Sequence, residues 1–198
     1  MNYRCARWIT RWLVKLPVTP NQVTLCSLGV GVVAILAFSR GSWWSAILGA
    51  WCLEVVYVLD HCDGELARMR GAVTVLGQWL DTVVDTVIHV GLFPAMAVGL
   101  VRQGLTPSLT AVGYVGASAT LVIYGITMIQ EHRREHRLSR ALPGWHHMKD
   151  VARTDYALLV LFCALAGWLP GLLWISAVGA CVLCGAMTVH VLRGGQIL

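Results

Sequence analysis

Long apolar segments run through most of this 198-residue sequence and leave few folds open to it. A helix that crosses a bilayer needs about 20 mainly apolar residues. Six segments meet this requirement, at approximately 21–39, 42–60, 78–100, 108–130, 155–170 and 172–192. Charged residues make up only 13% of the chain, whereas soluble domains carry about 25%. We therefore predict an all-α integral membrane protein with six transmembrane helices.

The basic residues are distributed unevenly among the segments that join these helices. If the N-terminus lies in the cytoplasm, 13 of the 15 lysines and arginines are cytoplasmic, and only Arg40 and Arg102 are outside. Such a bias sets the orientation of membrane proteins. The sequence thus predicts a multi-pass protein of a prokaryotic inner membrane, with both termini in the cytoplasm. This orientation accounts for the net charge of +5, and we expect no nucleic-acid partner.

The N-terminal segment, residues 1–18, differs from the rest of the chain in composition. Between Tyr3 and Leu16 it carries four basic residues among tryptophans and aliphatic side chains. This pattern is typical of an amphipathic helix at the membrane interface, with its basic face toward anionic lipid headgroups. A merely basic leader before the first span would fit the charges equally well. We divide the chain into this juxtamembrane segment and a six-helix domain at 19–198.

Acidic residues are concentrated at the end of the second apolar segment and the start of the third. Five of the ten lie there: Asp60, Asp63, Glu65, Asp81 and Asp85. The first two are three residues apart and the last two are four apart, so a helical backbone would place each aspartate pair on one face. Ionisable residues in membrane spans are energetically costly and commonly functional. Two such faces, opposed at the cytoplasmic end, would bring four carboxylates together.

Four carboxylates in a medium of low dielectric constant require compensating positive charge. Ligand sets made only of oxygen suit Mg²⁺ or Mn²⁺ better than Zn²⁺, and these ions commonly hold a diphosphate during phosphoryl transfer. Small residues at Gly64, Ala67 and Gly77 would let a polar ligand approach the helix backbones, and Arg68 could pair with a phosphate group. Alternatively, Arg68, Arg70 or water could satisfy each carboxylate separately.

The acidic segments also match a known motif. Its fixed positions are Asp60-x2-Asp63-Gly64-x2-Ala67-Arg68-x8-Gly77-x3-Asp81-x3-Asp85. At every fixed position this pattern resembles the signature of the CDP-alcohol phosphotransferase (CDP-alcohol phosphatidyltransferase) family. The signature covers only 26 residues. The segment Thr19-Pro20-Asn21-Gln22-Val23-Thr24 also looks like the opening of that family's first span.

The resemblance implies an activity and a role for each motif residue. Family members transfer a phosphatidyl-type group from a CDP-linked lipid, such as CDP-diacylglycerol, to an alcohol acceptor in phospholipid biosynthesis, and release CMP. By position, two Mg²⁺ or Mn²⁺ ions would be bound by Asp60, Asp63, Asp81 and Asp85. Asp85 would also be the catalytic base that takes the proton of the acceptor. The CDP-binding residues would be Asp63, Gly64, Ala67, Arg68 and Gly77.

Membrane lipids are a further expected partner, and the resemblance implies a homodimer. A basic loop at 132–153 bears on the acceptor. Its cations could bind anionic lipid and set the orientation of the chain, or bind a phosphorylated acceptor. We favour a phosphorylated polyol, either inositol phosphate or glycerol 3-phosphate, and expect it to contact Arg153, Lys149 and Arg140.

His89 continues the row formed by Gly77, Asp81 and Asp85 at a spacing of four residues. In a helix, this spacing places the imidazole on the face that carries the two aspartates. It could orient Asp85 or relay its proton, or it could be hydrogen-bonded within the helix bundle. The sequence leaves these alternatives open.

Two other classes of membrane protein use carboxylates within the bilayer. An intramembrane prenyltransferase, acting on a prenyl diphosphate with Mg²⁺, would need more spans and a second aspartate motif far along the chain. A non-enzymatic ion or proton transporter would spread its acidic residues through the bilayer or between two half-repeats, and the sequence shows neither pattern. Both classes remain alternatives to the transferase.

Overall fold

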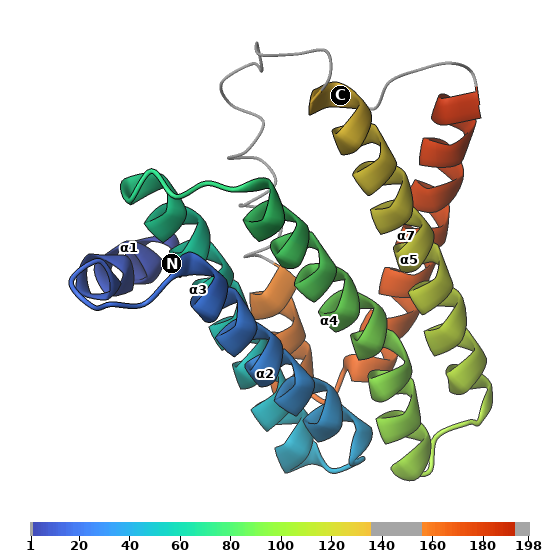
Figure 1. Ribbon diagram of the computed structural model, residues 1–198. Coiled ribbons are helices and arrows are strands. Elements are labelled where there is room, and N and C mark those ends of the chain that lie inside the picture. Colours follow the sequence, from blue (N-terminus) through green and yellow to red (C-terminus); the bar gives the residue numbers. More distant parts are fainter. Residues whose placement is uncertain (1, 136–155, 193–198) are drawn as a thin grey trace.

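A computed structural model describes residues 2–135 and 156–192 (Figure 1). These residues form helices joined by short turns, with no β-strand among them. The helices are α1 (Asn2–Leu13), α2 (Pro20–Ser39), α3 (Trp43–Met69), α4 (Val75–Arg102), α5 (Ser108–Glu135) and α7 (Leu169–Leu192), with a shorter helix, Tyr156–Leu165, before α7. The predicted all-helical class is confirmed for this part of the chain.

Five helices, α2 to α5 and α7, are long and apolar enough to cross a membrane. The predicted span at 155–170 coincides with the shorter helix, whose first residue, Tyr156, is also the first described residue after 135. Ten helical residues extend about 15 Å, roughly half of the hydrocarbon core of a bilayer. The structure therefore indicates a multi-pass membrane protein with five long apolar helices.

The two helices that carry the acidic motif are longer than the apolar segments that predicted them. Helix α3 continues beyond residue 60 to Met69, and α4 begins at Val75. Hydropathy marks only the part of a helix that suits lipid, whereas the backbone helix continues until a turn signal ends it. Here Gly71 adopts a positive φ of 60°, and the Thr74 hydroxyl then caps α4 by accepting a hydrogen bond from the Gly77 amide. Both aspartate pairs thus lie on continuous helices, as predicted.

Helices α2, α3 and α4 form the closely packed part of the bundle, and α5 and α7 lie beside α4 on the side away from α1 (Figure 1). Small residues allow the close packing. A Cβ atom on Gly99 of α4 would lie only 1.9 Å from the carbonyl oxygen of Phe38 at the end of α2. At this point the two helices are in backbone contact, which only glycine permits.

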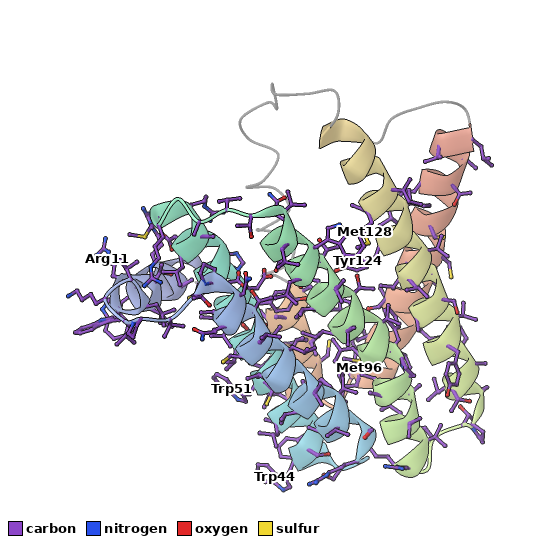
Figure 2. The ribbon with its side chains drawn as sticks, in the orientation of Figure 1. Arg11, Trp44, Trp51, Met96, Tyr124 and Met128 are labelled. Carbon is purple, nitrogen blue, oxygen red and sulfur yellow. The ribbon has the colours of Figure 1, made fainter. Side chains whose placement is uncertain are left out.

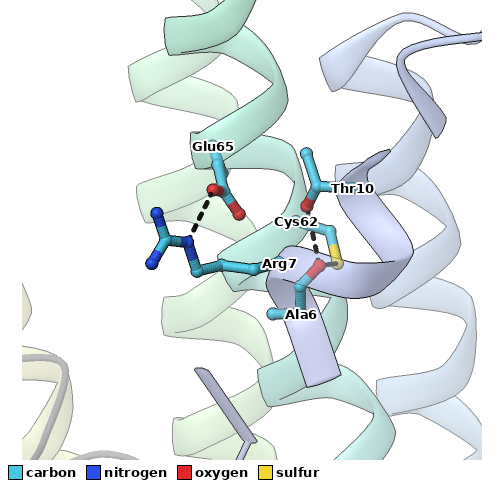
Figure 3. Close-up of polar contacts among 5 residues, drawn as sticks. All are labelled: Ala6, Arg7, Thr10, Cys62 and Glu65. Atoms are coloured by element: carbon cyan, nitrogen blue, oxygen red, sulfur yellow. Dashed lines mark hydrogen bonds and ion pairs between the residues drawn. The ribbon is translucent and has the colours of Figure 1, made fainter. Parts of the chain in front are cut away.

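Helix α1 lies across the bundle, since Figure 1 shows it nearly end-on while the other helices run down the picture. The side of α1 that carries small residues faces α3, and Ala6 and Thr10 on that side are buried. Figure 3 shows the contacts: the Cys62 thiol of α3 donates to the Ala6 carbonyl at 3.5 Å, and Arg7 forms an ion pair with Glu65 at 3.6 Å. The helix predicted in this segment is confirmed.

Large apolar side chains cover the outside of the molecule. Trp8 and Trp12 of α1 are 63% and 56% exposed. Figure 2 shows Trp44 and Trp51 on the outer side of α3, and Arg11 pointing away from the bundle on α1. Exposed tryptophans and aliphatic side chains are expected on a surface that faces lipid.

Candidate active site

A cavity of about 430 Å³ lies between the start of α2, the last turns of α3 and the first turns of α4. Its lining contains every residue assigned to CDP from the sequence and two further aspartates of the motif. These are Asp63, Gly64, Ala67, Arg68 and Gly77, with Asp60 and Asp81. The structure therefore brings seven of the eight motif residues to one cavity, which we call the acidic cavity.

Asp60, Asp63 and Asp81 form the acidic centre of this cavity. One carboxylate oxygen from each residue lies within 4.8 Å of the other two. Two of these residues belong to α3 and one to α4, so helix packing brings the carboxylates together. Three carboxylates at this separation offer a set of oxygen ligands that suits a hard divalent cation. The residues present therefore fit a metal ion.

Asp63 is buried, and its carboxylate accepts a hydrogen bond of 2.6 Å from the Thr24 hydroxyl of α2. The start of α2 is fixed by a capping box: the Thr19 hydroxyl accepts from the Gln22 amide, and the Gln22 side chain accepts from the Thr19 amide. This cap places Thr24 one turn into the helix, facing Asp63. The sequence analysis gave Thr24 no role, because its partner becomes visible only when α2 packs on α3.

Asp85 is buried, with 7% of its surface exposed, one turn of α4 beyond Asp81. Among the described residues, the group of carboxylates within 4.8 Å of one another includes Asp81 but not Asp85. The lining of the acidic cavity likewise includes Asp81 and not Asp85. The geometry thus brings three of the four predicted carboxylates together, and the metal-binding and catalytic roles of Asp85 stay predictions.

Gly77 lies where the start of α4 approaches the start of α2. A Cβ atom at this position would lie 3.1 Å from the side-chain oxygen of Asn21 and 3.1 Å from the hydroxyl oxygen of Thr74. By contrast, a Cβ atom on Gly64 would lie 3.5 Å from the Arg68 guanidinium, an ordinary contact. Asn21, which belongs to the segment that resembles the opening of the family's first span, and Thr74 also line the cavity. Of the two glycines in the motif, Gly77 therefore has less room for an added side chain than Gly64.

Two arginines near the end of α3 point to different parts of the structure. Arg68 lines the acidic cavity. Arg70 turns instead toward the connection between α1 and α2, where its guanidinium donates to four backbone carbonyl oxygens. They belong to Leu13 at 3.1 Å, Val14 at 3.0 Å, Leu16 at 2.6 Å and Val18. Only Arg68 is placed to meet an anionic ligand in the cavity.

A second cavity, of about 340 Å³, lies further along α4 and is bordered by Tyr57, His89, Tyr124, Tyr156 and Ser176. We call it the aromatic cavity. Its remaining lining residues are Leu92, Phe93, Met96, Thr120 and Leu173. Figure 2 shows Tyr124 on the side of α5 that faces α4, and Met96 further along. Among the described residues, none that borders this cavity is Asp, Glu, Lys or Arg.

His89 is hydrogen-bonded within the bundle, as one of the sequence alternatives proposed. Its Nδ1 lies 2.8 Å from the backbone carbonyl oxygen of Asp85, and its Nε2 lies 3.0 Å from the Tyr57 hydroxyl oxygen. The Tyr124 hydroxyl lies 3.2 Å from Nδ1. Neither tyrosine was marked by the sequence, because a contact between helices leaves no periodic pattern along the chain.

The predicted acceptor-binding residues Arg140, Lys149 and Arg153 lie outside the described residues. The same is true of most of the basic loop at 132–153. Their assignment to the acceptor therefore stays a prediction.

Comparison with known families agrees with this geometry. The family model for CDP-alcohol phosphatidyltransferase matches residues 17–192, which is most of the chain. The protein therefore belongs to the CDP-alcohol phosphatidyltransferase family, as the motif indicated. This membership decides against the prenyltransferase and transporter alternatives.

Two curated relatives illustrate the range of the similarity. The phosphatidylinositol phosphate synthase of Corynebacterium glutamicum is 36% identical over 118 residues, which are 58% of this chain and 52% of that protein. The bifunctional IPC transferase and DIPP synthase of Aquifex aeolicus is 24% identical over 183 residues, which are 90% of this chain and 40% of that protein. The chain thus spans about half, or less, of the length of these relatives.

A solved structure shares the fold. The crystal structure of Mycobacterium tuberculosis phosphatidylinositol phosphate synthase in apo form superposes with a TM-score of 0.61. The match covers 90% of this chain and 93% of that one, at 23% sequence identity. At this identity the likeness establishes the arrangement of the helices.

Proposed function

We propose that this protein transfers a phosphatidyl-type group from a CDP-linked lipid, such as CDP-diacylglycerol, to a phosphorylated polyol and releases CMP. The observation that carries the proposal is the acidic cavity, in which Asp60, Asp63 and Asp81 converge beside Arg68. Carboxylates that hold a cation, together with an adjacent guanidinium, are suited to a diphosphate. Family membership gives the class of reaction.

The residues of the acidic cavity divide the work of the proposed reaction. Asp60, Asp63 and Asp81, with Asp85, would hold Mg²⁺ or Mn²⁺, and two such ions would offset the charge of the diphosphate. The Thr24 hydroxyl orients the Asp63 carboxylate through its 2.6 Å hydrogen bond. Gly64, Ala67 and Gly77 leave room for the cytidine diphosphate group, and Arg68 pairs with a phosphate oxygen.

Asp85 is the proposed general base. It takes the proton of the acceptor hydroxyl as the oxygen forms a bond to the β-phosphorus, and the bond from that phosphorus to CMP breaks. A base must lie within hydrogen-bond reach of the proton that it removes. The position of Asp85, one turn from Asp81 on the same helix, supports this role because the acceptor would bind next to the diphosphate.

Inositol phosphate is the acceptor that we favour over glycerol 3-phosphate. The support comes from the names of similar proteins, since the relative from Corynebacterium glutamicum and the solved structure are both phosphatidylinositol phosphate synthases. Arg140, Lys149 and Arg153 would bind the acceptor phosphate. Arg153→Ala should then raise the KM for the phosphorylated acceptor more than it raises the KM for the CDP-lipid. If both KM values stay unchanged, this assignment fails.

We further propose six spans, both termini in the cytoplasm of a prokaryotic cell, and an acidic cavity that faces the cytoplasm. The support is the placement of charge. Arg102 donates a 2.7 Å hydrogen bond to the Ser39 carbonyl, so the two arginines assigned to the outside, Arg40 and Arg102, lie near the same end of the bundle. The turn between α3 and α4 lies at the opposite end, beside α1 (Figure 1).

The same orientation would place α1 at the cytoplasmic interface. Its exposed Trp8 and Trp12 would enter the interface, and its basic side chains would meet anionic headgroups. We keep the division into a juxtamembrane segment at 1–18 and a six-helix domain at 19–198, and we propose a homodimer as the assembly.

The deciding experiment is an assay of CMP release by the purified protein with CDP-diacylglycerol and Mg²⁺. The acceptors would be inositol phosphate, glycerol 3-phosphate, serine, inositol and none. Release that requires inositol phosphate would establish both the reaction and the acceptor. Release with serine or inositol would contradict the phosphorylated acceptor, and no release with any of them would contradict the proposed donor and acceptor classes.

A further inference from the structure

Tyr57 lies about one helix turn from Asp60 on α3, and His89 lies about two turns from Asp81 on α4, so both residues stand on the helices that carry the carboxylates of the acidic cavity. Tyr57 precedes Asp60 by three residues on α3, and His89 follows Asp85 by four and Asp81 by eight on α4. Residues at these spacings share a helix face and are separated by about 5 Å per turn along the axis. The pair therefore faces the same boundary between α3 and α4 as the carboxylates do.

The contact between the two side chains is a defined hydrogen bond. The Asp85 carbonyl oxygen, 2.8 Å from His89 Nδ1, can only accept, so Nδ1 of the imidazole carries a hydrogen. In the neutral ring Nε2 is then an acceptor, and the Tyr57 hydroxyl donates to it at 3.0 Å. Tyr57 is buried, and its ring meets the imidazole edge to face at 6.0 Å between centroids. This hydrogen bond joins α3 directly to α4, and both helices also pack against α2.

The carboxylates of the acidic cavity destabilise the contact between α3 and α4. Asp60 and Asp63 on α3 lie within 4.8 Å of Asp81 on α4, so like charges face one another across the two helices. Such charges repel, and the repulsion is strong where water is scarce. Before a cation binds, it acts to separate α3 from α4. A cross-helix hydrogen bond one turn away on α3 and about two turns away on α4 opposes that separation.

We propose that the Tyr57–His89 hydrogen bond is a positioning element that holds α3 and α4 at the separation required for metal binding. The bond fixes the spacing of the carboxylates before the ion arrives, so less ordering is required on binding. The inference rests on the proposed metal-dependent function of the acidic cavity. Tyr57 and His89 would act through the carboxylates and not by contact with the substrate.

The test is Tyr57→Phe in the full-length protein, which removes one hydroxyl and keeps the ring. Binding of Mn²⁺ alone, without substrate, would be titrated by electron paramagnetic resonance and by the rise in melting temperature with Mn²⁺ concentration. We expect about a tenfold weaker Mn²⁺ affinity, in the range found when groups that support metal ligands are removed. At saturating metal, kcat and the KM for the CDP-lipid should stay near those of the unmodified protein.

The matched control is Tyr156→Phe. Tyr156 borders the same aromatic cavity, but its hydroxyl lies 3.4 Å from Ser176 of α7 and so does not join α3 to α4. We expect this protein to bind Mn²⁺ as the unmodified protein does. Equal Mn²⁺ affinities for Tyr57→Phe and the unmodified protein, or equal losses in Tyr57→Phe and Tyr156→Phe, would overturn the inference.

Substitutions of His89 provide a second test. His89→Gln keeps a side-chain acceptor for the Tyr57 hydroxyl and should retain most of the Mn²⁺ affinity, whereas His89→Leu should lose as much as Tyr57→Phe. If both substitutions weaken Mn²⁺ binding equally, the hydrogen bond is not the cause. Because Mn²⁺ binding is measured without turnover, absence of CMP release by the unmodified protein would count against the proposed function alone.

Discussion

The acidic cavity and the aromatic cavity both border α3 and α4, yet they contain different kinds of polar group. The acidic cavity, at the turn between the two helices, is lined by three aspartates and Arg68. The aromatic cavity, further along α4, contains tyrosines, His89, a serine and a threonine, and no Asp, Glu, Lys or Arg among the residues that the structure describes. On α4 the change in composition occurs over about two helix turns, between Asp81 and His89.

In the orientation proposed above, depth in the membrane accounts for this difference. A formal charge in the hydrocarbon region is energetically costly, whereas a charge near a helix end can be offset by water and by ions from solution. Neutral hydroxyl and imidazole groups can satisfy one another in pairs, as Tyr57 and His89 do. The three clustered aspartates thus lie near the turn between α3 and α4, whereas the neutral pair Tyr57 and His89 lies further along the two helices, and the buried Glu54 of α3 is an exception to this division.

The largest effect that this comparison predicts belongs to the acidic centre. Asp81→Asn should lower CMP release by about a thousandfold, because electrostatic stabilisation of the reacting phosphate is commonly the largest catalytic contribution. Mn²⁺ binding should weaken as well. Glu65→Gln is the control, since Glu65 lies on the other side of α3 and pairs with Arg7. If Glu65→Gln were as inactive as Asp81→Asn, the three-aspartate centre would lose its special role.

Substitution of Asp85 should impair catalysis much more than metal binding. Asp85→Asn should reduce CMP release by about 10²- to 10⁴-fold, the usual contribution of a general base. Because Asp85 lies outside the group of three carboxylates, Mn²⁺ should still bind, more weakly than to the unmodified protein. Activity above one tenth of the original would remove Asp85 as the base, and the melting temperature would show whether the protein is folded.

Substitutions of the two arginines at the end of α3 should have smaller effects, one on the KM for the CDP-lipid and the other on thermal stability. Arg68→Lys should raise the KM for the CDP-lipid about tenfold, because an ammonium group cannot form the paired hydrogen bonds of a guanidinium. Arg70→Lys should instead lower the melting temperature and leave this KM unchanged, since Arg70 binds four backbone carbonyl oxygens outside the cavity. Steady-state kinetics and thermal unfolding on both proteins would check this; a KM change confined to Arg70→Lys contradicts the assignment.

The smallest effect should come from Gly77. Gly77→Ala places a Cβ atom 3.1 Å from Asn21 and Thr74, so these neighbours must shift by a few tenths of an ångström. We expect a rise of about threefold in the KM for the CDP-lipid, equivalent to less than about 1 kcal/mol of binding free energy. Gly125→Ala, with no atom within 4 Å of the added Cβ, is the control and should have no effect. Equal KM values for Gly77→Ala and the unmodified protein would show that space at this residue does not limit binding.

The helices and most of the acidic cavity followed from the sequence because both depend on local spacing. Apolar length predicted the spans, and the three- and four-residue intervals placed each aspartate pair on one face. What spacing could not give was the rotation and axial position of one helix against another. The structure places three of the four predicted carboxylates within 4.8 Å of one another, and the place of Asp85 beside them stays a prediction; the partners Thr24 of Asp63 and Tyr57 of His89 were not foreseen.

Arg70 shows the same limit in another way. From the sequence it was a candidate partner for a carboxylate, two residues from Arg68. In the structure its guanidinium meets backbone carbonyl oxygens at and just after the end of α1, where the helix dipole places partial negative charge. No sequence pattern marks those acceptors, because every residue has a carbonyl group.

The hydrogen bonds of Arg70 have a practical consequence for protein engineering. Shortening the chain to begin at residue 19 would remove all four carbonyl acceptors and leave the Arg70 guanidinium, two residues from Arg68, without these partners. We expect the freed guanidinium to add positive charge near Arg68. Ligand affinities measured on such a truncated protein would therefore describe a different charge distribution from that of the intact chain.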